Sequence, residues 1–327
     1  MTWKTAPNRS GFSMCYNSGM DFKDVERAHQ LYQSKVKKYS WISLVIGVLV
    51  SFVVAVTSGS GSLLGMVLIF IVIGGIATAI AAVVIMIASR KEAASYRSAY
   101  KAYFVEKNLQ KTFTDLKYSH EAGLSREVLS ATQMVNAGDV YTSNDLTTGK
   151  YKDVAFSQAD VQIQVESTDS DGDTTYTTIF KGRFMIFEFP KKFNFRLEVV
   201  EKWFGANRIP GKDPKTGRKF EKIEVESGEF NEIFKTYAED GFEAFYLLDP
   251  AFINNMITLA KQYTGKILLG FIENKLLIGL KDGKDAFEPP SVFKKLDEQV
   301  ETEKIAKDIH LITNFVDTLK LNNKLFK

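Results

Sequence analysis

The fold of this chain is decided by Trp41-Ile-Ser-Leu-Val-Ile-Gly-Val-Leu-Val-Ser-Phe-Val-Val-Ala-Val-Thr57 and by Leu63-Leu-Gly-Met-Val-Leu-Ile-Phe-Ile-Val-Ile-Gly-Gly-Ile-Ala-Thr-Ala-Ile-Ala-Ala-Val-Val-Ile-Met-Ile-Ala88, with Ser58-Gly-Ser-Gly-Ser62 between them. These 48 consecutive positions contain no Asp, Glu, Lys or Arg, although 25% of the 327 residues are charged. The mean hydropathy of the whole chain, -0.10, is that of an ordinary soluble protein and conceals this segment. A purely soluble fold is therefore excluded.

The uncharged stretch predicts two membrane-spanning helices, residues 41–57 and 63–88, joined by the small turn-forming residues 58–62. The first has 17 residues and is marginal for a hydrocarbon core of about 30 Å, whereas the second has 26 and can cross with tilt. A buried helical hairpin of a soluble protein would carry a polar face, and neither segment has one. A signal peptide would be followed by a cleavage site, whereas here a second span follows.

Positive charge flanks the two predicted spans. Residues 1–40 and residues 89–117 each carry a net charge of +4, the turn between the spans carries none, and residues 118–327 carry -5. Because basic flanks stay on the cytoplasmic side, we predict a multi-pass protein of the inner (cytoplasmic) membrane with both termini in the cytoplasm. The single cysteine, Cys15, fits a reducing compartment. The predicted contacts with the membrane surface are Lys35, Lys37, Lys38, Arg90 and Lys91.

Small residues recur at every fourth position of both spans, which allows helices to approach closely. In the first span they are Ser43, Gly47, Ser51 and Ala55, and in the second Gly74, Thr78 and Ala82. Two interpretations stay open: the two spans pack on each other, or the rows form the seam of a homo-oligomer. Neither span contains an ionisable residue, which argues against a proton relay or an ion pathway.

Amphipathic helices are predicted on both sides of the spans. Aromatic and aliphatic residues fall at helical spacing within residues 1–40, and again within residues 89–117. We predict an N-terminal segment with an amphipathic helix leading into the membrane, and a helical stalk leading out of it. The two aromatic stripes then pair as an antiparallel extension of the membrane hairpin. His29 lies on this stripe and is interpreted as a packing residue.

Residues 118–327 are predicted to form a cytoplasmic α+β domain, with a mainly antiparallel sheet, packed helices and a long last helix. Strand-like alternation occurs at 161–166, 176–189, 197–200, 223–225, 267–272 and 276–280. Asp249-Pro250 predicts the start of a helix, and Gly265 its stop. After Pro289-Pro290, the last helix is predicted to bury the following side chains: Leu296, Val300, Ile305, Ile309, Ile312, Phe315 and Leu319.

Five short blocks follow one another in a distinctive order. They are Tyr141-Thr-Ser-Asn-Asp145-Leu-Thr-Thr-Gly149, Phe180-Lys-Gly182-Arg-Phe184, Glu229-Phe230-Asn231-Glu-Ile-Phe234, Tyr237-Ala-Glu-Asp240 and Glu243-Ala-Phe-Tyr-Leu-Leu-Asp-Pro250-Ala-Phe252. From Asp115 to its C-terminus the chain resembles the bacterial domain-of-unknown-function family 3137. The resemblance implies a membrane-anchored bacterial protein whose activity is not established, and it assigns no catalytic residues. The passage Lys191 to Phe195 departs from the family pattern.

The turn bearing Asp169, Asp171 and Asp173 is the candidate cation site, because three carboxylates on one loop could bind a hard cation. A solvated hairpin turn is the competing interpretation, since Thr174 and Phe180 stand where an EF-hand has its Gly and its Glu. With three histidines and one cysteine, no zinc set or Cys/His dyad is expected. No catalytic residue and no cofactor is predicted, and the acidic domain argues against nucleic acid.

The leading functional hypothesis is a membrane-anchored cytoplasmic binding or scaffold protein that recognises another membrane or membrane-proximal protein beside the lipid bilayer. Two alternatives stay open. One is an enzyme of unrecognised type, such as a cation-assisted hydrolase using the acidic turn. The other is a component of an oligomeric membrane complex formed through the rows of small residues.

Overall fold

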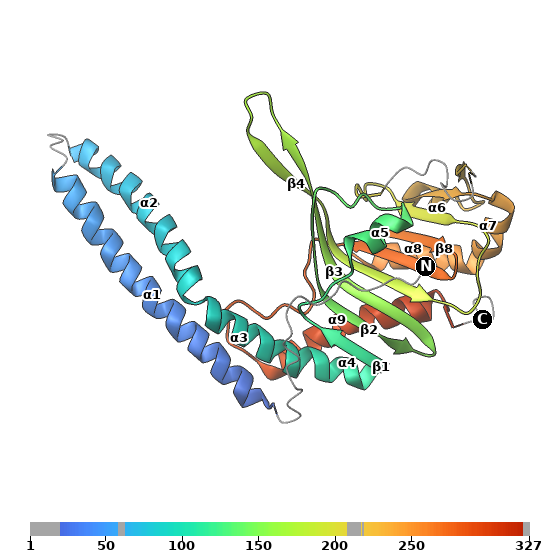
Figure 1. Ribbon diagram of the computed structural model, residues 1–327, viewed down its shortest axis with the longest axis horizontal. Coiled ribbons are helices and arrows are strands. Elements are labelled where there is room, and N and C mark those ends of the chain that lie inside the picture. The colour runs from blue at the N-terminus through green and yellow to red at the C-terminus, as the bar shows by residue number, and fades with distance from the viewer. Residues whose placement is uncertain (1–19, 58–62, 208–216, 218, 323–327) are drawn as a thin grey trace. The chain divides into compact units, whose positions relative to one another are not determined.

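The computed structural model describes residues 20–57, 63–207, 217 and 219–322 (Figure 1). It confirms the predicted α+β class with an antiparallel sheet. The chain divides into two compact units. Among the described residues, the helical unit contains 20–105 and 288–302, and the sheet unit contains 106–287 and 303–322. Residues 106–117 group with the sheet, and residues 288–302 group with the helices.

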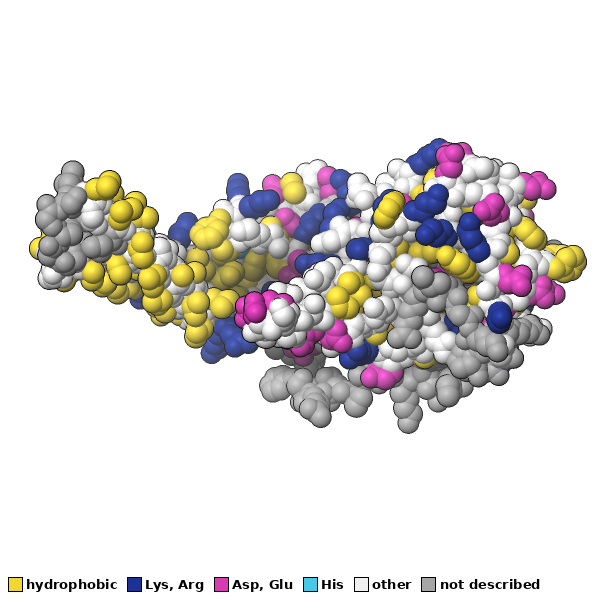
Figure 2. Space-filling model, turned by 90° about the horizontal axis from the view of Figure 1, so that it is seen from above, with side chains coloured by type: hydrophobic (Ala, Val, Ile, Leu, Met, Phe, Trp, Pro, Cys, Tyr) yellow, Lys and Arg dark blue, Asp and Glu magenta, His cyan; other side chains and the backbone are white. Residues whose placement is uncertain are grey.

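Two helices dominate the helical unit, α1 (Phe22–Thr57) and α2 (Leu63–Ala88). In the described part of the chain, residues 22–54 and 70–88 are long and apolar enough to cross a membrane. The predicted amphipathic helix and the first predicted span are one continuous helix, because neither proline nor glycine interrupts residues 22–46. Large apolar side chains of both helices are exposed over most of the predicted spans, as the yellow surface on the left of Figure 2 shows.

Small side chains let α1 and α2 pack closely. A Cβ at Gly47 would lie 3.5 Å from the Cβ of Ala77, and one at Gly74 would lie 3.8 Å from the Oγ of Ser51. Ser43 is half-buried and Ser51 is buried, which agrees with packing of the hairpin on itself. The side chain of Ala55 lies outside the described part.

The three predicted packing positions on the second span differ in their burial. Gly74 is half-buried, as are Ala77 and Ala81, whereas Thr78 and Ala82 are exposed. A strict four-residue repeat turns by about 40° per step around a helix with 3.6 residues per turn. Alternating steps of three and four residues keep one face toward the partner helix, and α2 follows that pattern.

The predicted stalk is shorter than expected. It consists of α3 (Arg90–Tyr100), the π-helical turn η1 (Lys101–Glu106) and α4 (Lys107–Thr112), and β1 (Thr114–Ser119) follows instead of a helix to residue 117. Phe113 takes an extended conformation, and its ring lies 4.6 Å from that of Phe156. Burial of this aromatic ring against the sheet therefore decides where the helix ends, which the helical periodicity did not indicate.

The aromatic stripes of α1 and the stalk do pair. The Tyr96 ring lies 5.0 Å from His29 and 6.2 Å from Tyr32. Tyr100 is fully buried and donates a hydrogen bond of 2.6 Å to the Glu301 carboxylate. Of the predicted membrane-surface residues, Lys35 is paired with Glu92 at 2.6 Å, so its charge is partly neutralised inside the hairpin.

We expect Tyr32→Ala to lower the free energy of unfolding by about 2 kcal/mol, since truncation leaves a half-filled space beside Tyr96. Leu31→Ala is the matched control, because Leu31 is 58% exposed and should change stability by less than about 0.5 kcal/mol. Thermal unfolding of the full chain in detergent measures both. Equal effects of the two substitutions would show that the pairing does not stabilise the helical unit.

The sheet unit is built on nine antiparallel strands in the order β1-β2-β3-β4-β9-β8-β5-β7-β6. The strands after β1 are β2 (Val140–Tyr151), β3 (Val154–Thr168), β4 (Thr174–Glu188), β5 (Leu197–Glu201), β6 (Glu221–Ile223), β7 (Phe234–Ala238), β8 (Lys266–Ile272) and β9 (Lys275–Lys281). Both predicted hairpins are present, as β3–β4 and β8–β9. The predicted strand at 223–225 lies two residues earlier, and the passage from Lys191 to Phe195 joins β4 to β5.

Helices cover both faces of the sheet. One face is covered by α5 (Arg126–Thr132), and the opposite face by α8 (Pro250–Gln262) and α9 (Glu298–Thr318) (Figure 1). Two further short helices, α6 (Gly228–Ile233) and α7 (Gly241–Leu247), flank β7.

The predictions for α8 and α9 can be compared with the structure at the two ends of α8 and at Val300. Asp249 caps α8 as predicted, but α8 ends at Gln262 with an extended Tyr263. Gly265 is needed because a Cβ there would lie 2.6 Å from the Lys281 carbonyl oxygen. Val300 is 59% exposed instead of buried, since it lies in the first turn of α9.

Candidate functional site

A pocket opens between α5 and the face of the sheet that α5 covers. The helix begins after Ser125, whose hydroxyl accepts a hydrogen bond of 3.3 Å from the Val128 amide, a typical N-cap. Its apolar side, which includes Val128 and the buried Leu129, is turned toward the sheet. The cap and the following turn thereby place Leu124 and Val128 over the strands.

The floor of the pocket is a row of directly opposed residues on four strands. Ser157 of β3 lies opposite Ile186 of β4, Ile186 opposite Leu277 of β9, and Leu277 opposite Gly270 of β8. Opposed residues of an antiparallel sheet project on the same face. Small residues at both ends of the row, beside two large ones in the middle, leave space beneath α5.

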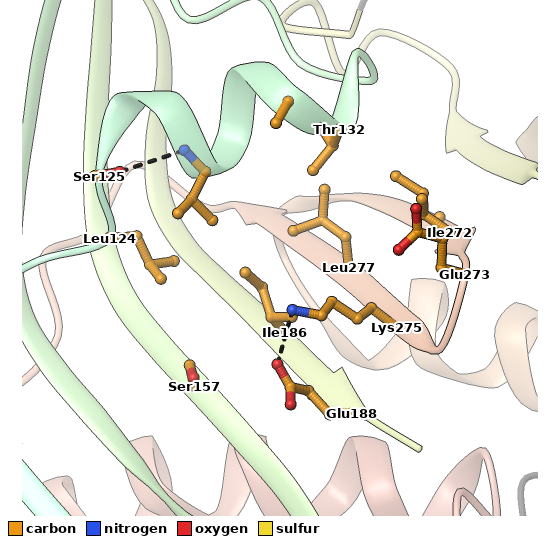
Figure 3. Close-up of a pocket in the computed structure, with 13 residues that line it drawn as sticks. Leu124, Ser125, Thr132, Ser157, Ile186, Glu188, Ile272, Glu273, Lys275 and Leu277 are labelled. Atoms are coloured by element: carbon orange, nitrogen blue, oxygen red, sulfur yellow. Dashed lines mark hydrogen bonds and ion pairs between the residues drawn. The ribbon is translucent and has the colours of Figure 1, made fainter. Parts of the chain in front are cut away.

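The pocket has a volume of about 120 Å³ and an apolar lining with a polar rim. Leu124, Ile186 and Leu277 point into the space between α5 and the sheet (Figure 3). On the rim, the Lys275 ammonium lies 2.9 Å from the Glu188 carboxylate, with Glu273 beside them (Figure 3). An apolar hollow with a few polar groups at its edge is typical of a binding site.

A buried carboxyl group lies next to this row. Glu198 of β5 is directly opposite Gly270, so it projects on the face of the pocket, yet it is only 1% exposed. Burial raises the pKa of Glu198 to about 8, and the nearby positive charge of Arg196 only partly opposes this. Glu198 is therefore mainly protonated at neutral pH and lies in the sheet as a neutral group.

A second cluster of polar residues lies on the opposite face of the sheet. Oxygens of Asp145, Asp160 and Asp285 lie within 4.8 Å of one another, and in the described part of the chain these are the residues that could hold a cation. Asp145 is fully buried at a bulge of β2 and has a φ of 57°. The Tyr118 hydroxyl and the Asn144 amide both donate to its carboxylate.

The positive charge of Arg183 lies beside the carboxyl groups of this cluster. The Arg183 side chain is 7% exposed; its Nε lies 3.6 Å from the Asp160 carboxylate, and its Nη1 donates at 2.8 Å to the Asp308 carbonyl oxygen. Burial raises the pKa of Asp160 well above its usual range; Arg183 opposes this, while the charges of Asp285 and Asp145 add to it. The Ala286 amide already donates to Asp160. The Asp160 carboxylate is thus already contacted by the Arg183 guanidinium and the Ala286 amide.

The acidic turn predicted as a cation site lies at the tip of the β3–β4 hairpin. The Asp169 carboxylate accepts hydrogen bonds from the Asp171 amide at 3.0 Å and the Asp173 amide at 2.9 Å. The Oδ1 atom of Asp169 accepts both bonds and closes the turn, and all three aspartates are exposed. This arrangement is that of an Asx-type hairpin turn, so the structure does not bring the predicted ligands together around one point.

We expect replacement of Asp169, Asp171 and Asp173 by Asn to change the free energy of unfolding by less than about 1 kcal/mol, because the turn is exposed and Asn can accept the same bonds. Calorimetric titration of the full chain with Ca²⁺ or Mg²⁺ should show no stoichiometric micromolar binding at this turn. Micromolar binding that the triple substitution abolishes would restore the turn as a metal site.

Neither the pocket nor the Arg183 cluster was predicted from the sequence. Asp145 and Arg183 lie within the quoted sequence blocks, but their meeting depends on pairing β2, β3 and β4. The sequence feature that could have indicated the pocket is Gly270, because a glycine inside an apolar strand often marks a close approach of another part of the chain. Any side chain at Gly270 would overlap the sulfur of Met134.

Together, the fold and these sites define a two-unit protein in which an apolar helical hairpin is joined to an α+β domain with an open apolar pocket. Residues 178–321 match the family described as "Protein of unknown function (DUF3137)". The match confirms the resemblance from residue 178 onward, whereas the block at 141–149 lies outside it.

One solved structure is similar over much of the chain, the crystal structure of the mycobacterial trehalose monomycolate transport factor A, TtfA. It covers 67% of this chain and 93% of its own, with 10% sequence identity and a TM-score of 0.33. At this TM-score the likeness does not establish a shared fold. No curated protein matches the chain.

Proposed function

We propose that this chain is a membrane-anchored binding protein whose sheet domain holds a membrane-proximal protein partner through the pocket beneath α5. The observation that carries the proposal is the open apolar pocket with its charged rim, on a domain joined to two helices able to span a membrane. A scaffold role follows if the partner is held beside the bilayer.

The volume of the pocket supports a protein partner. A cavity of about 120 Å³ is close to the size that accepts one benzene ring or one large apolar side chain. Interfaces are commonly anchored by such a side chain in a pocket with a polar rim. We infer that one aliphatic or aromatic side chain of the partner enters between Leu124, Ile186 and Leu277.

The membrane placement is part of the proposal. Both basic flanks are expected on the cytoplasmic side of an inner membrane, which makes the protein multi-pass with both termini in the cytoplasm. A cysteine placed at Ser60 should then be labelled from outside intact cells by an impermeant reagent, and one at Asn322 should not. Exterior labelling at Asn322 would overturn this orientation.

Filling the pocket tests the binding role. We expect Ala131→Phe to abolish photo-crosslinking of a stoichiometric partner by a benzophenone amino acid at Ser125 in native membranes, because Ala131 lines the pocket. Ser130→Phe is the matched control on the same helix, since Ser130 is not among the lining residues. Identical crosslinking by both variants would show that the pocket is not the binding site.

A homo-oligomer is the other arrangement consistent with the apolar helices. Thr78 and Ala82 face away from α1, so a second copy could pack on that side of α2. The same benzophenone placed at Thr78 distinguishes this case, because it would then crosslink two copies of the chain.

A further inference from the structure

The short helix α7 exposes three aromatic side chains. Phe242 is 72% exposed, Tyr246 is 63% exposed and Phe245 is 49% exposed, while Ala244 and Leu247 of the same helix are buried. The rings of Phe242 and Tyr246 lie 5.6 Å apart, edge to face. Large aromatic residues grouped on a surface are uncommon unless they contact a partner.

The segment of the chain that carries these aromatic side chains is acidic. From Thr236 through Ala260 the chain contains no Lys or Arg, and it contains Glu239, Asp240, Glu243 and Asp249. Glu243 and Asp249 are exposed, whereas Asp240 caps the helix by accepting from the Phe242 and Glu243 amides. Figure 2 shows exposed hydrophobic side chains at the right-hand end, where Figure 1 places α7, with acidic side chains near them and Lys or Arg side chains in the same region.

We infer that the aromatic surface of α7, Phe242, Phe245 and Tyr246 with Glu243, is a docking site for a protein segment that carries arginine or lysine side chains. A guanidinium group stacks on the face of an aromatic ring and pairs with a carboxylate. This surface offers both kinds of contact, through its aromatic rings and through the Glu243 carboxylate. The pocket beneath α5 is not required for this contact. The alternative occupant, the bilayer surface, is disfavoured because an anionic leaflet repels the surrounding carboxylates.

The test uses the full chain in nanodiscs of zwitterionic lipid and a fluorescent octa-arginine peptide as the probe. Replacing Phe242, Phe245 and Tyr246 together by Ser keeps every charge, and we expect at least tenfold weaker binding. Glu243→Gln should weaken binding by roughly threefold. Trp203→Ser is the matched control, because Trp203 is an aromatic residue 88% exposed elsewhere on the sheet unit, and it should leave binding unchanged.

Two results would overturn the inference. Binding of the triple variant as tight as that of the parent chain would show that the probe senses only net charge. Quenching of a tryptophan introduced as Phe245→Trp, in a chain whose own tryptophans are replaced by Phe, by brominated lipid would assign the surface to the membrane. Circular dichroism checks that the exposed substitutions leave the fold intact.

Discussion

Arg183→Met is expected to lower the free energy of unfolding by about 3–5 kcal/mol, the cost of leaving a buried charge without its partner. Arg183 of β4 lies directly opposite Asp160 of the adjacent strand β3, and it also donates to the carbonyl oxygen of Asp308 on α9. Removing the guanidinium leaves the carboxyl groups of Asp145, Asp160 and Asp285 close together with no compensating charge from this strand. The substitution therefore loosens both β4 and the packing of α9 on the sheet.

Chemical denaturation of the full chain in detergent measures this effect. Lys222→Met is a suitable control, because Lys222 forms an exposed ion pair with Glu224 and its loss should change stability by less than about 0.5 kcal/mol. Adding Asp160→Asn to Arg183→Met should recover part of the loss, since one of the unpaired charges is removed. A loss below about 1 kcal/mol for Arg183→Met would show that the ion pair does not hold the sheet to α9.

The second large effect is a dependence of stability on pH that Glu198→Gln removes. Burial raises the pKa of Glu198 from an ordinary 4.5 to about 8 in the folded protein. Between these values the folded state keeps a proton that the unfolded state releases, so stability falls as the pH rises. The contribution is fully present below pH of about 4.5 and is lost by a pH of about 8, at up to ~1.4 kcal/mol for each pH unit.

The difference in stability between the parent chain and Glu198→Gln isolates this group from others that titrate, including Asp160. We expect Glu198→Gln to be more stable than the parent at pH 8.5 by a few kcal/mol, on the order of the pKa shift converted to free energy. At about pH 4.5 the two should be nearly equal. Glu226→Gln, the same substitution at an exposed position, provides the control. Parallel curves for Glu198→Gln and the parent would rule out a neutral buried Glu198.

The sequence alone predicted the features that depend on the pattern of neighbouring residues, namely the apolar helices, the β-hairpins and the start of α8. A segment of 48 uncharged, mostly apolar residues is unfavourable in water, so the composition alone predicted the apolar helical hairpin. Period-two alternation and Asp249-Pro250 predicted both hairpins and the start of α8, because strand pleat and helix capping are set by neighbouring residues. The same reasoning failed at Phe113, where contact with the distant Phe156 decides where a helix ends.

The pocket beneath α5 and the cluster around Arg183 could be found only from the tertiary structure. Ser157, Ile186, Leu277 and Gly270 lie on four strands, and strand order and register make them one row beneath α5. Asp145, Asp160 and Arg183 likewise meet only because β2, β3 and β4 are adjacent in that register. A shift of one residue in any of these pairings would turn the side chains to the other face. Local pattern shows that a strand exists, whereas the burial of the whole sheet between its helices selects the register that builds a pocket.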